Sequence, residues 1–100
     1  MSSLVVTTVT AARAMANDWL VSHLPDRFAA GVPEYDQSAQ GWRIPVWLSY
    51  PQLDPLGPVG ELVVDEGTGE VRDHTAIAVM KERALSLYEQ HREQIEAPLP

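Results

Sequence analysis

VGELVVDEGTGEVRDH, residues 59–74, is the stretch of sequence that decides the fold. Residues 59–65 and 70–75 have the composition of strands, and the four residues EGTG stand between them. Gly69 can adopt a positive φ at no steric cost, and the side chains of Asp65 and Thr68 can accept hydrogen bonds from amides of the turn. The stretch therefore predicts an antiparallel hairpin with a tight turn at residues 66–69.

A second strand is predicted at residues 42–50 (WRIPVWLSY). Strand alternation places five residues on one face: Trp42, Ile44, Val46, Leu48 and Tyr50. It places four on the other: Arg43, Pro45, Trp47 and Ser49. Because Pro45 has no N–H to donate to a neighbouring strand, we expect this strand to lie at a sheet edge or to be bulged at Pro45. The prolines of residues 51–58 (PQLDPLGP) predict a connection between the two strands.

The sequence before residue 42 predicts one long helix and several short segments. Residues 2–10 (SSLVVTTVT) suit a short strand or an extended arm, and a helical pattern follows over residues 10–24. Thr8 or Thr10 can cap this helix, and Pro25 ends it. We expect a brief second helix over residues 26–30, ended by Gly31, and a loop over residues 32–41.

A C-terminal helix is predicted over residues 76–95, with Thr75 or Asp73 as its N-cap. Its apolar stripe recurs at spacings of three and four: Ile77, Met80, Ala84, Leu87, Tyr88, His91 and Ile95. Its opposite face is charged: Lys81, Glu82, Glu89, Arg92, Glu93 and Glu96. The chain is therefore predicted to be a single α+β domain over residues 1–100, with an N-terminal helix, an antiparallel sheet of about three strands and a C-terminal helix packed on one face in two layers.

Composition and charge exclude several classes of function. The 100-residue chain has a net charge of −7, whereas phosphate binding needs clustered Lys and Arg, so nucleic acid is not expected as the partner. Residues 51–100 hold ten acidic and four basic residues, which either complement a basic partner or serve solubility. Residues 1–10 do not resemble a signal peptide, and no apolar run is long enough to span a bilayer. We expect a cytoplasmic protein that binds no membrane.

The hairpin also carries a resemblance to a known family. GELVVDEGTGEV, residues 60–71, resembles the strand–turn–strand of PepSY-like domains, first noticed in the propeptides of secreted metallopeptidases. In that family a helix precedes a small antiparallel sheet, and a turn of the pattern Val-Asp, two residues, Thr-Gly-Glu-Val joins two strands. The order of elements over roughly residues 10–75 is similar. The resemblance implies a binding or inhibitory module without catalytic residues.

The sequence holds no recognisable catalytic or cofactor-binding motif. It has no cysteine, and the spacing of His23, His74 and His91 matches no short metal-ligand motif. The acids around the hairpin do not match a calcium loop, because Gly67 and Gly69 stand where oxygen donors are required. We expect no catalytic residues, no metal and no cofactor. A small enzyme would need an enclosed polar pocket that gathers His74 with Asp or Arg side chains.

The aromatic residues of the predicted strand are the main candidates for a binding surface. Trp42 and Trp47 lie on opposite faces, so at most one faces the core. The other, expected to be Trp47 beside Arg43, is either an exposed binding residue or is covered by residues 51–58.

We predict a non-catalytic protein-interaction or inhibitory module, such as an antitoxin-like inhibitor. Its predicted partner-binding residues come from the strand and from the acidic helix face: Trp42, Arg43, Trp47, Tyr50, Glu82, Glu89 and Glu93. The alternative is a homo-oligomeric structural or small-ligand-binding domain. In that case the edge strand near Pro45, or residues 4–10, pairs with a second copy across a two-fold axis to form a dimer.

Overall fold

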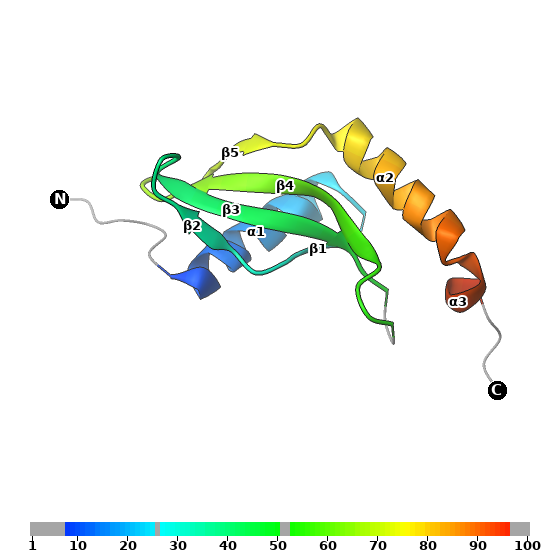
Figure 1. The fold of residues 1–100 in the computed structure, drawn as a ribbon. Helices are drawn as coiled ribbons and strands as arrows, with labels where there is room; N and C mark the ends of the chain where they lie inside the picture. Colours follow the sequence, from blue (N-terminus) through cyan, green and yellow to red (C-terminus); the bar gives the residue numbers. More distant parts are fainter. Residues whose placement is uncertain (1–7, 26, 51–52, 97–100) are drawn as a thin grey trace.

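The predicted α+β fold is confirmed by the computed structural model, which describes residues 8–25, 27–50 and 53–96. In chain order the elements are α1 (Val9–His23), β1 (Phe28–Ala30), β2 (Glu34–Asp36), β3 (Gly41–Leu48), β4 (Gly57–Asp65), β5 (Val71–His74), α2 (Ile77–Gln90) and α3 (Arg92–Glu96). The strands form one antiparallel sheet in the order β1-β3-β4-β5, and β2 also pairs with β3. The sheet thus has five strands where about three were expected. Figure 1 shows α1 behind the sheet and α2 leading away from it.

The predicted hairpin is the β4–β5 pair, and its turn chemistry is confirmed. Gly69 has a φ of 77°, in the left-handed region that favours glycine. Asp65 Oδ1 accepts hydrogen bonds from the amides of Gly67 (2.7 Å) and Thr68 (3.0 Å). The Thr68 hydroxyl in turn accepts one from the Glu70 amide at 3.2 Å. The turn fixes the register in which Val64 lies opposite Val71.

Strand β3 lies in the middle of the sheet, so the expectation of an edge strand was wrong. It pairs with β4 on one side and with both β1 and β2 on the other. The Pro45 carbonyl accepts a hydrogen bond from the Gly31 amide at 2.8 Å, which places the missing N–H of Pro45 on the side of β1 and β2. Residues 31–33, between β1 and β2, interrupt the pairing there, so a central strand accommodates the proline. The register shift between β3 and β4 falls one residue later, between Val46 and Trp47.

Two short strands replace elements that the sequence predicted differently. Phe28–Ala30 is strand β1, not the second helix expected over residues 26–30, and its Phe28 lies opposite Leu48. Glu34–Asp36 is strand β2 within the expected loop. Both are three residues long and owe their conformation to pairing with β3, which outweighs local propensity. Residue 26, residues 51–52 and most of the segment expected as an arm lie outside the described residues.

The helix ends agree only in part with expectation. Thr8 caps α1 as predicted, since its Oγ1 accepts a hydrogen bond from the Ala11 amide at 3.1 Å. Helix α2 has Ala76 as its N-cap without a side-chain hydrogen bond, so the predicted caps were wrong. The Thr75 hydroxyl instead accepts from the Glu61 amide at 3.0 Å, and an Asp73 oxygen accepts from the His74 amide at 2.9 Å. The expected continuous helix is also divided at His91 into α2 and α3.

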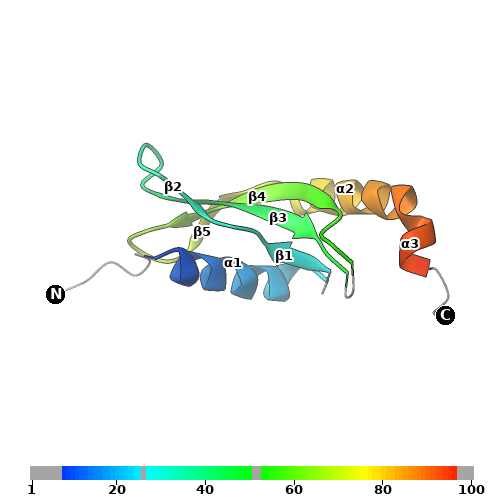
Figure 2. The ribbon, with the colours of Figure 1, turned by 60° about the horizontal axis from the view of Figure 1, so that its bottom comes forward.

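The core lies between the sheet and the two long helices. Figure 2 shows α1 running along one face of the sheet. The predicted alternation of β3 is confirmed, because four of its side chains are buried on this face: Trp42, Ile44, Val46 and Leu48. The helices contribute Ala12, Ala16, Leu20, Met80 and Ala84 to the same cluster. Within the described residues, no helix packs on the other face of the sheet.

Candidate functional site

The outer face of the sheet is the side opposite the core, and it carries the odd-numbered residues of β3. Among residues 8–25, 27–50 and 53–96, no helix crosses this face, which is turned toward the reader in Figure 1. Arg43 is exposed, whereas Pro45 and Trp47 are half-buried. An aromatic side chain therefore lies on an open sheet face.

Trp47 forms one wall of an outer-face groove, which we define by Val32, Pro45, Trp47 and Pro55, with a volume of about 490 Å³. The indole lies directly over Gly31, where a Cβ would come within 2.4 Å of the indole Nε1. Trp47 is thus half-buried, between the two alternatives of full exposure and full cover. Pro55 of the connection before β4 lines the groove together with it.

The first helix supports this groove from the side of β1. Arg13 and Glu34 line it as well, and Arg13 Nε donates a hydrogen bond to the Ala30 carbonyl at 3.1 Å. The Ala30 amide donates to Asn17 Oδ1 at 3.0 Å. The N–H and C=O groups of Ala30 are therefore both hydrogen-bonded to side chains of α1. They are not available to pair with an additional strand at this edge of the sheet.

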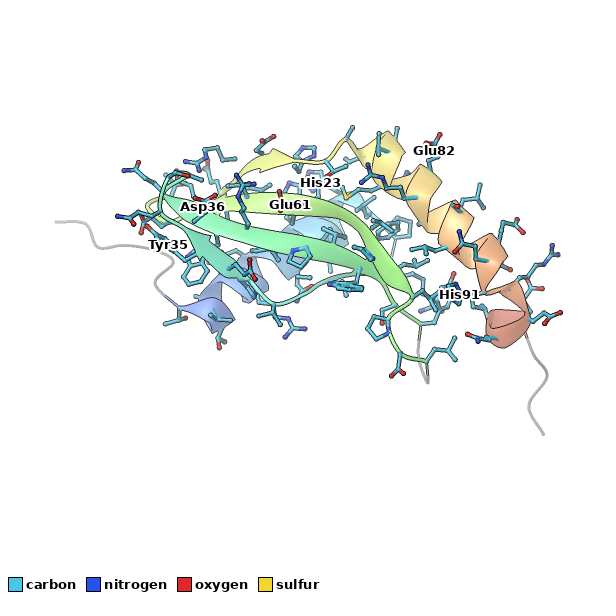
Figure 3. All side chains as sticks on the ribbon, in the orientation of Figure 1. His23, Tyr35, Asp36, Glu61, Glu82 and His91 are labelled. Atoms are coloured by element: carbon cyan, nitrogen blue, oxygen red, sulfur yellow. The ribbon has the colours of Figure 1, made fainter. Side chains whose placement is uncertain are left out.

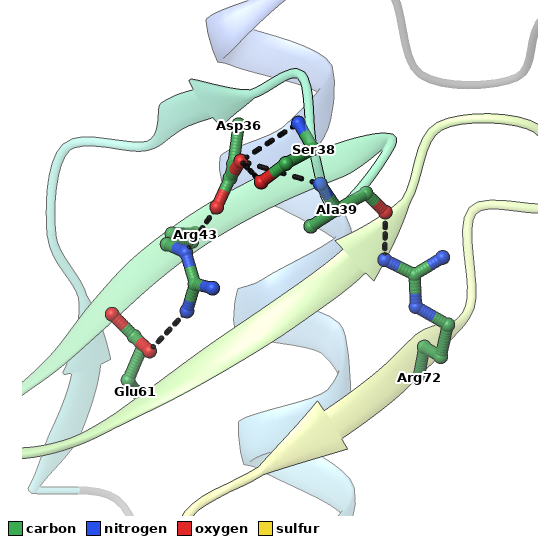
Figure 4. A network of polar contacts seen from close by, with 6 residues as sticks. All are labelled: Asp36, Ser38, Ala39, Arg43, Glu61 and Arg72. Atoms are coloured by element: carbon green, nitrogen blue, oxygen red, sulfur yellow. Dashed lines mark hydrogen bonds and ion pairs between the residues drawn. The ribbon is translucent and has the colours of Figure 1, made fainter.

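Arg43 is held in a network across three strands, shown in Figure 4. Its Nε lies 2.5 Å from Asp36 Oδ2 on β2, and its Nη1 lies 2.9 Å from Glu61 Oε1 on β4. Asp36 Oδ1 also accepts hydrogen bonds from the Ser38 hydroxyl (2.7 Å), the Ser38 amide (3.0 Å) and the Ala39 amide (3.2 Å). These bonds, the one from the Ser38 side chain first and that from Arg43 next, lower the pKa of Asp36 from 3.8 to about 2.

The lowered pKa of Asp36 makes a pH-dependent contribution to stability. Because its folded-state pKa lies below the ordinary value of 3.8, its contribution is full above that value and is lost as the pH falls through about 2. We expect Asp36→Asn to be less stable than the wild type at neutral pH, and the difference to shrink as the pH is lowered to about 2. Urea unfolding of both proteins across this range measures the difference.

Asp54→Asn is the matched control, since Asp54 is an exposed carboxylate in the connection before β4. A difference between Asp36→Asn and the wild type that stayed constant down to pH of about 2 would contradict the assigned role of the Asp36 carboxylate.

The predicted partner-binding residues fall in four places. Trp42 is 8% exposed, packs edge-on to Tyr35 with ring centroids 5.3 Å apart, and belongs to the core. Arg43 and Trp47 share the outer face. Tyr50 is half-buried near α2, with Arg27 5.0 Å from its ring centroid and Tyr88 6.5 Å away.

The acidic residues of the prediction are exposed on the last helices. Glu82 and Glu89 lie on α2 and Glu93 lies on α3, as expected from the helical pattern. Figure 3 shows Glu82 pointing away from the sheet, whereas His91 points back toward the connection before β4. This acidic surface is separate from the outer-face groove.

The histidines do not gather into a site. His23 and His74 pack against Trp19, with ring centroids 4.2 and 4.7 Å from the indole. Their Nδ1 atoms each lie 2.8 Å from a backbone carbonyl oxygen, and His91 Nδ1 lies 2.9 Å from that of Leu87. Because a carbonyl only accepts, each contact is a hydrogen bond in the tautomer whose Nδ1 carries the proton. Within the described ranges, no group of three or more His, Asp or Glu residues could hold a metal ion.

The sequence revealed the groove walls outside β3 only in part. Val32 belongs to a segment expected to be a loop, and no local pattern signals that it meets Trp47. Contact of Trp47 with residues 51–58 was one of the two expected alternatives, and Pro55 lines the groove with it. In the part of the chain that the structure describes, none of the helices is long and apolar enough to cross a membrane. Comparison of the chain with protein-family models, with curated proteins and with solved structures finds no match.

Proposed function

We propose that this chain is a non-catalytic, cytoplasmic protein-binding module that restrains a protein partner, as an antitoxin-like inhibitor does. The observation that carries the proposal is the outer-face groove, because a half-buried Trp beside prolines on an uncovered sheet face has the composition of a binding hot spot. The resemblance to PepSY-like domains supports the same kind of function, since it implies a binding or inhibitory module.

The groove is suited to receive an apolar side chain of the partner. Trp47 is already fixed between β3 and Gly31, so little side-chain freedom remains to be lost when a partner covers it. The neighbouring Arg43 is fixed by Asp36 and Glu61, and it supplies a preorganised polar rim. A fixed apolar anchor with a polar rim is the usual anatomy of a specific protein interface.

The net charge of the chain indicates the character of the partner. At −7, the chain attracts a basic protein over long range and speeds its association at low salt. We therefore propose a partner with a basic surface and an exposed apolar residue, of the kind that a nucleic-acid-handling enzyme presents. Such an inhibitor would restrain the enzyme by covering its surface and would need no chemistry of its own.

Affinity capture from the native cell tests this proposal. The tagged wild-type chain is expected to retain a basic protein in stoichiometric amount, and Val21→Ala is expected to retain the same protein. Val21 is a suitable control because it is 81% exposed and lies on α1, on the other side of the sheet. Trp47→Ala is expected to lose the protein. Recovery of no stoichiometric partner by the wild type would count against the proposed function.

A small-ligand-binding domain is the second candidate function. The volume of the groove, about 490 Å³, falls in the range of small-molecule sites, and its lining is mostly apolar. This function would be favoured if the wild-type chain retained no protein but an apolar fluorophore bound it and not Trp47→Ala.

A further inference from the structure

Helix α2 carries an exposed leucine on a stripe that does not face the core. The buried residues Met80 and Ala84 define its inner side. The adjacent stripe contains Ala78, Lys81, Leu85 and Tyr88, whose spacings alternate between three and four as in the seam of a helix pair. Leu85 at its centre is 60% exposed, and Ala78 is exposed as well. Leu85 is thus an exposed apolar side chain at the centre of a stripe that also carries the exposed Lys81.

The stripe borders a hollow of about 280 Å³ between α2 and strand β1. Its lining is mostly apolar and includes Phe28, Leu48 and Tyr50 together with Leu85 and Tyr88 of the helix. The two charged residues that line it, Arg27 and Lys81, are both basic, although the chain as a whole is acidic. The hollow therefore suits a partner that brings apolar side chains flanked by carboxylates.

The last two helices of the same chain have that chemistry. Beyond Leu85 the charges are mainly acidic, with Glu89, Glu93 and Glu96 outnumbering Arg92. Glu89 contacts Arg92 at 3.8 Å with both side chains more than half exposed, which leaves Glu89 able to pair with another cation. In α2, Lys81, Glu82 and Arg83 precede Leu85 and Glu89 follows it, and Lys81 and Glu89 each lie four residues from Leu85.

We propose that a second copy of this chain docks on the first through α2, with the two helices antiparallel and Leu85 of each copy at the two-fold axis. In this arrangement each residue faces the one equally far on the other side of Leu85. Lys81, four residues before Leu85, faces Glu89 of the partner subunit, four residues after it. The two-fold axis makes this pair twice, and it brings the two Leu85 side chains together beside the hollows that they line.

The interface leaves the outer-face groove free. The groove is lined by α1, β1, β2, β3, residues 31–32 and the connection before β4, and none of its lining residues belongs to α2. Dimer formation and partner capture through Trp47 can therefore fail independently, and the inference does not rest on the proposed function.

Sedimentation equilibrium of the full chain, from about 1 to 500 µM, tests the proposal. The wild type is expected to dimerise more weakly as salt rises, because the Lys81–Glu89 pairs are screened. Leu85→Glu is expected to weaken the dimer at least about 30-fold, since two carboxylates would meet at the axis. It is expected to stay folded, by circular dichroism, because Leu85 is exposed in the monomer.

A charge swap tests the antiparallel register. Lys81→Glu and Glu89→Lys are each expected to weaken the dimer about tenfold or more, and the double variant to recover wild-type association within about threefold. The two residues lie about 12 Å apart along one helix, so recovery cannot come from a contact within one copy. Glu70→Lys, the same change at an exposed residue near the hairpin turn, is the control and should leave association unchanged.

A wild type that is monomeric at the highest concentration would overturn the proposal. So would a dimer that is insensitive to Leu85→Glu, or a double variant that associates no better than the single ones.

Discussion

Replacing Leu20 by Ala is expected to lower the free energy of unfolding by about 2–5 kcal/mol. The Leu20 side chain is 1% exposed and lies in the core between α1 and the sheet. Its truncation removes buried apolar surface and leaves a cavity that the closely packed neighbours refill only in part. Equilibrium urea unfolding, followed by circular dichroism, measures the loss.

The adjacent residue provides the control for this prediction. Val21 follows Leu20 on the same helix but is 81% exposed, so Val21→Ala is expected to change the free energy of unfolding by no more than about 0.5 kcal/mol. Equal losses for the two variants would mean that α1 does not pack on the sheet through the stripe that contains Leu20.

The second large effect is expected where α2 meets strand β4. A Cβ at Gly60 would lie 2.7 Å from Met80 Cγ and 2.8 Å from Met80 Sδ, and Met80 is fully buried. Gly60→Ala is therefore expected to cost about 1–3 kcal/mol through overpacking. Met80→Ala is expected to cost about 2–5 kcal/mol through the cavity it leaves.

The double variant tests whether these two residues touch. In Gly60→Ala/Met80→Ala, the new methyl group enters space that Met80 has vacated, so the combined loss is expected to be smaller than the sum of the single losses by about 0.5–3 kcal/mol. Urea unfolding of the four proteins gives this coupling. Additive losses would show that Met80 of α2 does not pack against Gly60 of β4. The face of α2 that is proposed to bind the second copy would then be assigned wrongly.

The parts of the fold that could be predicted are those with a strong local signal. The hairpin turn follows from Gly69 and Asp65, and the buried face of β3 follows from the alternation around Ile44. The α1 cap at Thr8 follows from its hydroxyl next to a helical pattern. In each case neighbouring residues determine the structure, so the sequence is sufficient.

The parts that were missed depend on contacts far apart in the chain. Strands β1 and β2 are too short for a periodic signal, and only β3 holds them extended. The position of Pro45 in a central strand requires knowing that residues 31–33 interrupt the pairing opposite it. Thr75 was expected to cap α2, but it bonds the Glu61 amide on the neighbouring strand instead.

The candidate site could likewise be predicted only in part. Alternation correctly placed Trp47 and Arg43 on the face away from Ile44. It also placed Trp42 on the buried face, where its 8% exposure leaves little surface for a partner. The contact with the segment that holds Pro55 was one of the two alternatives for Trp47, whereas the wall at Val32 comes from an irregular segment without a local signal.

The affinity of the captured protein for the wild type and for Trp47→Ala, compared by calorimetry, tests the proposed binding face most directly. We expect Trp47→Ala to bind at least about 30-fold more weakly, as is usual for a hot-spot Trp, while Val21→Ala binds like the wild type. Equal affinities for Trp47→Ala and the wild type, with both proteins folded, would contradict the assignment of the outer-face groove as the binding site.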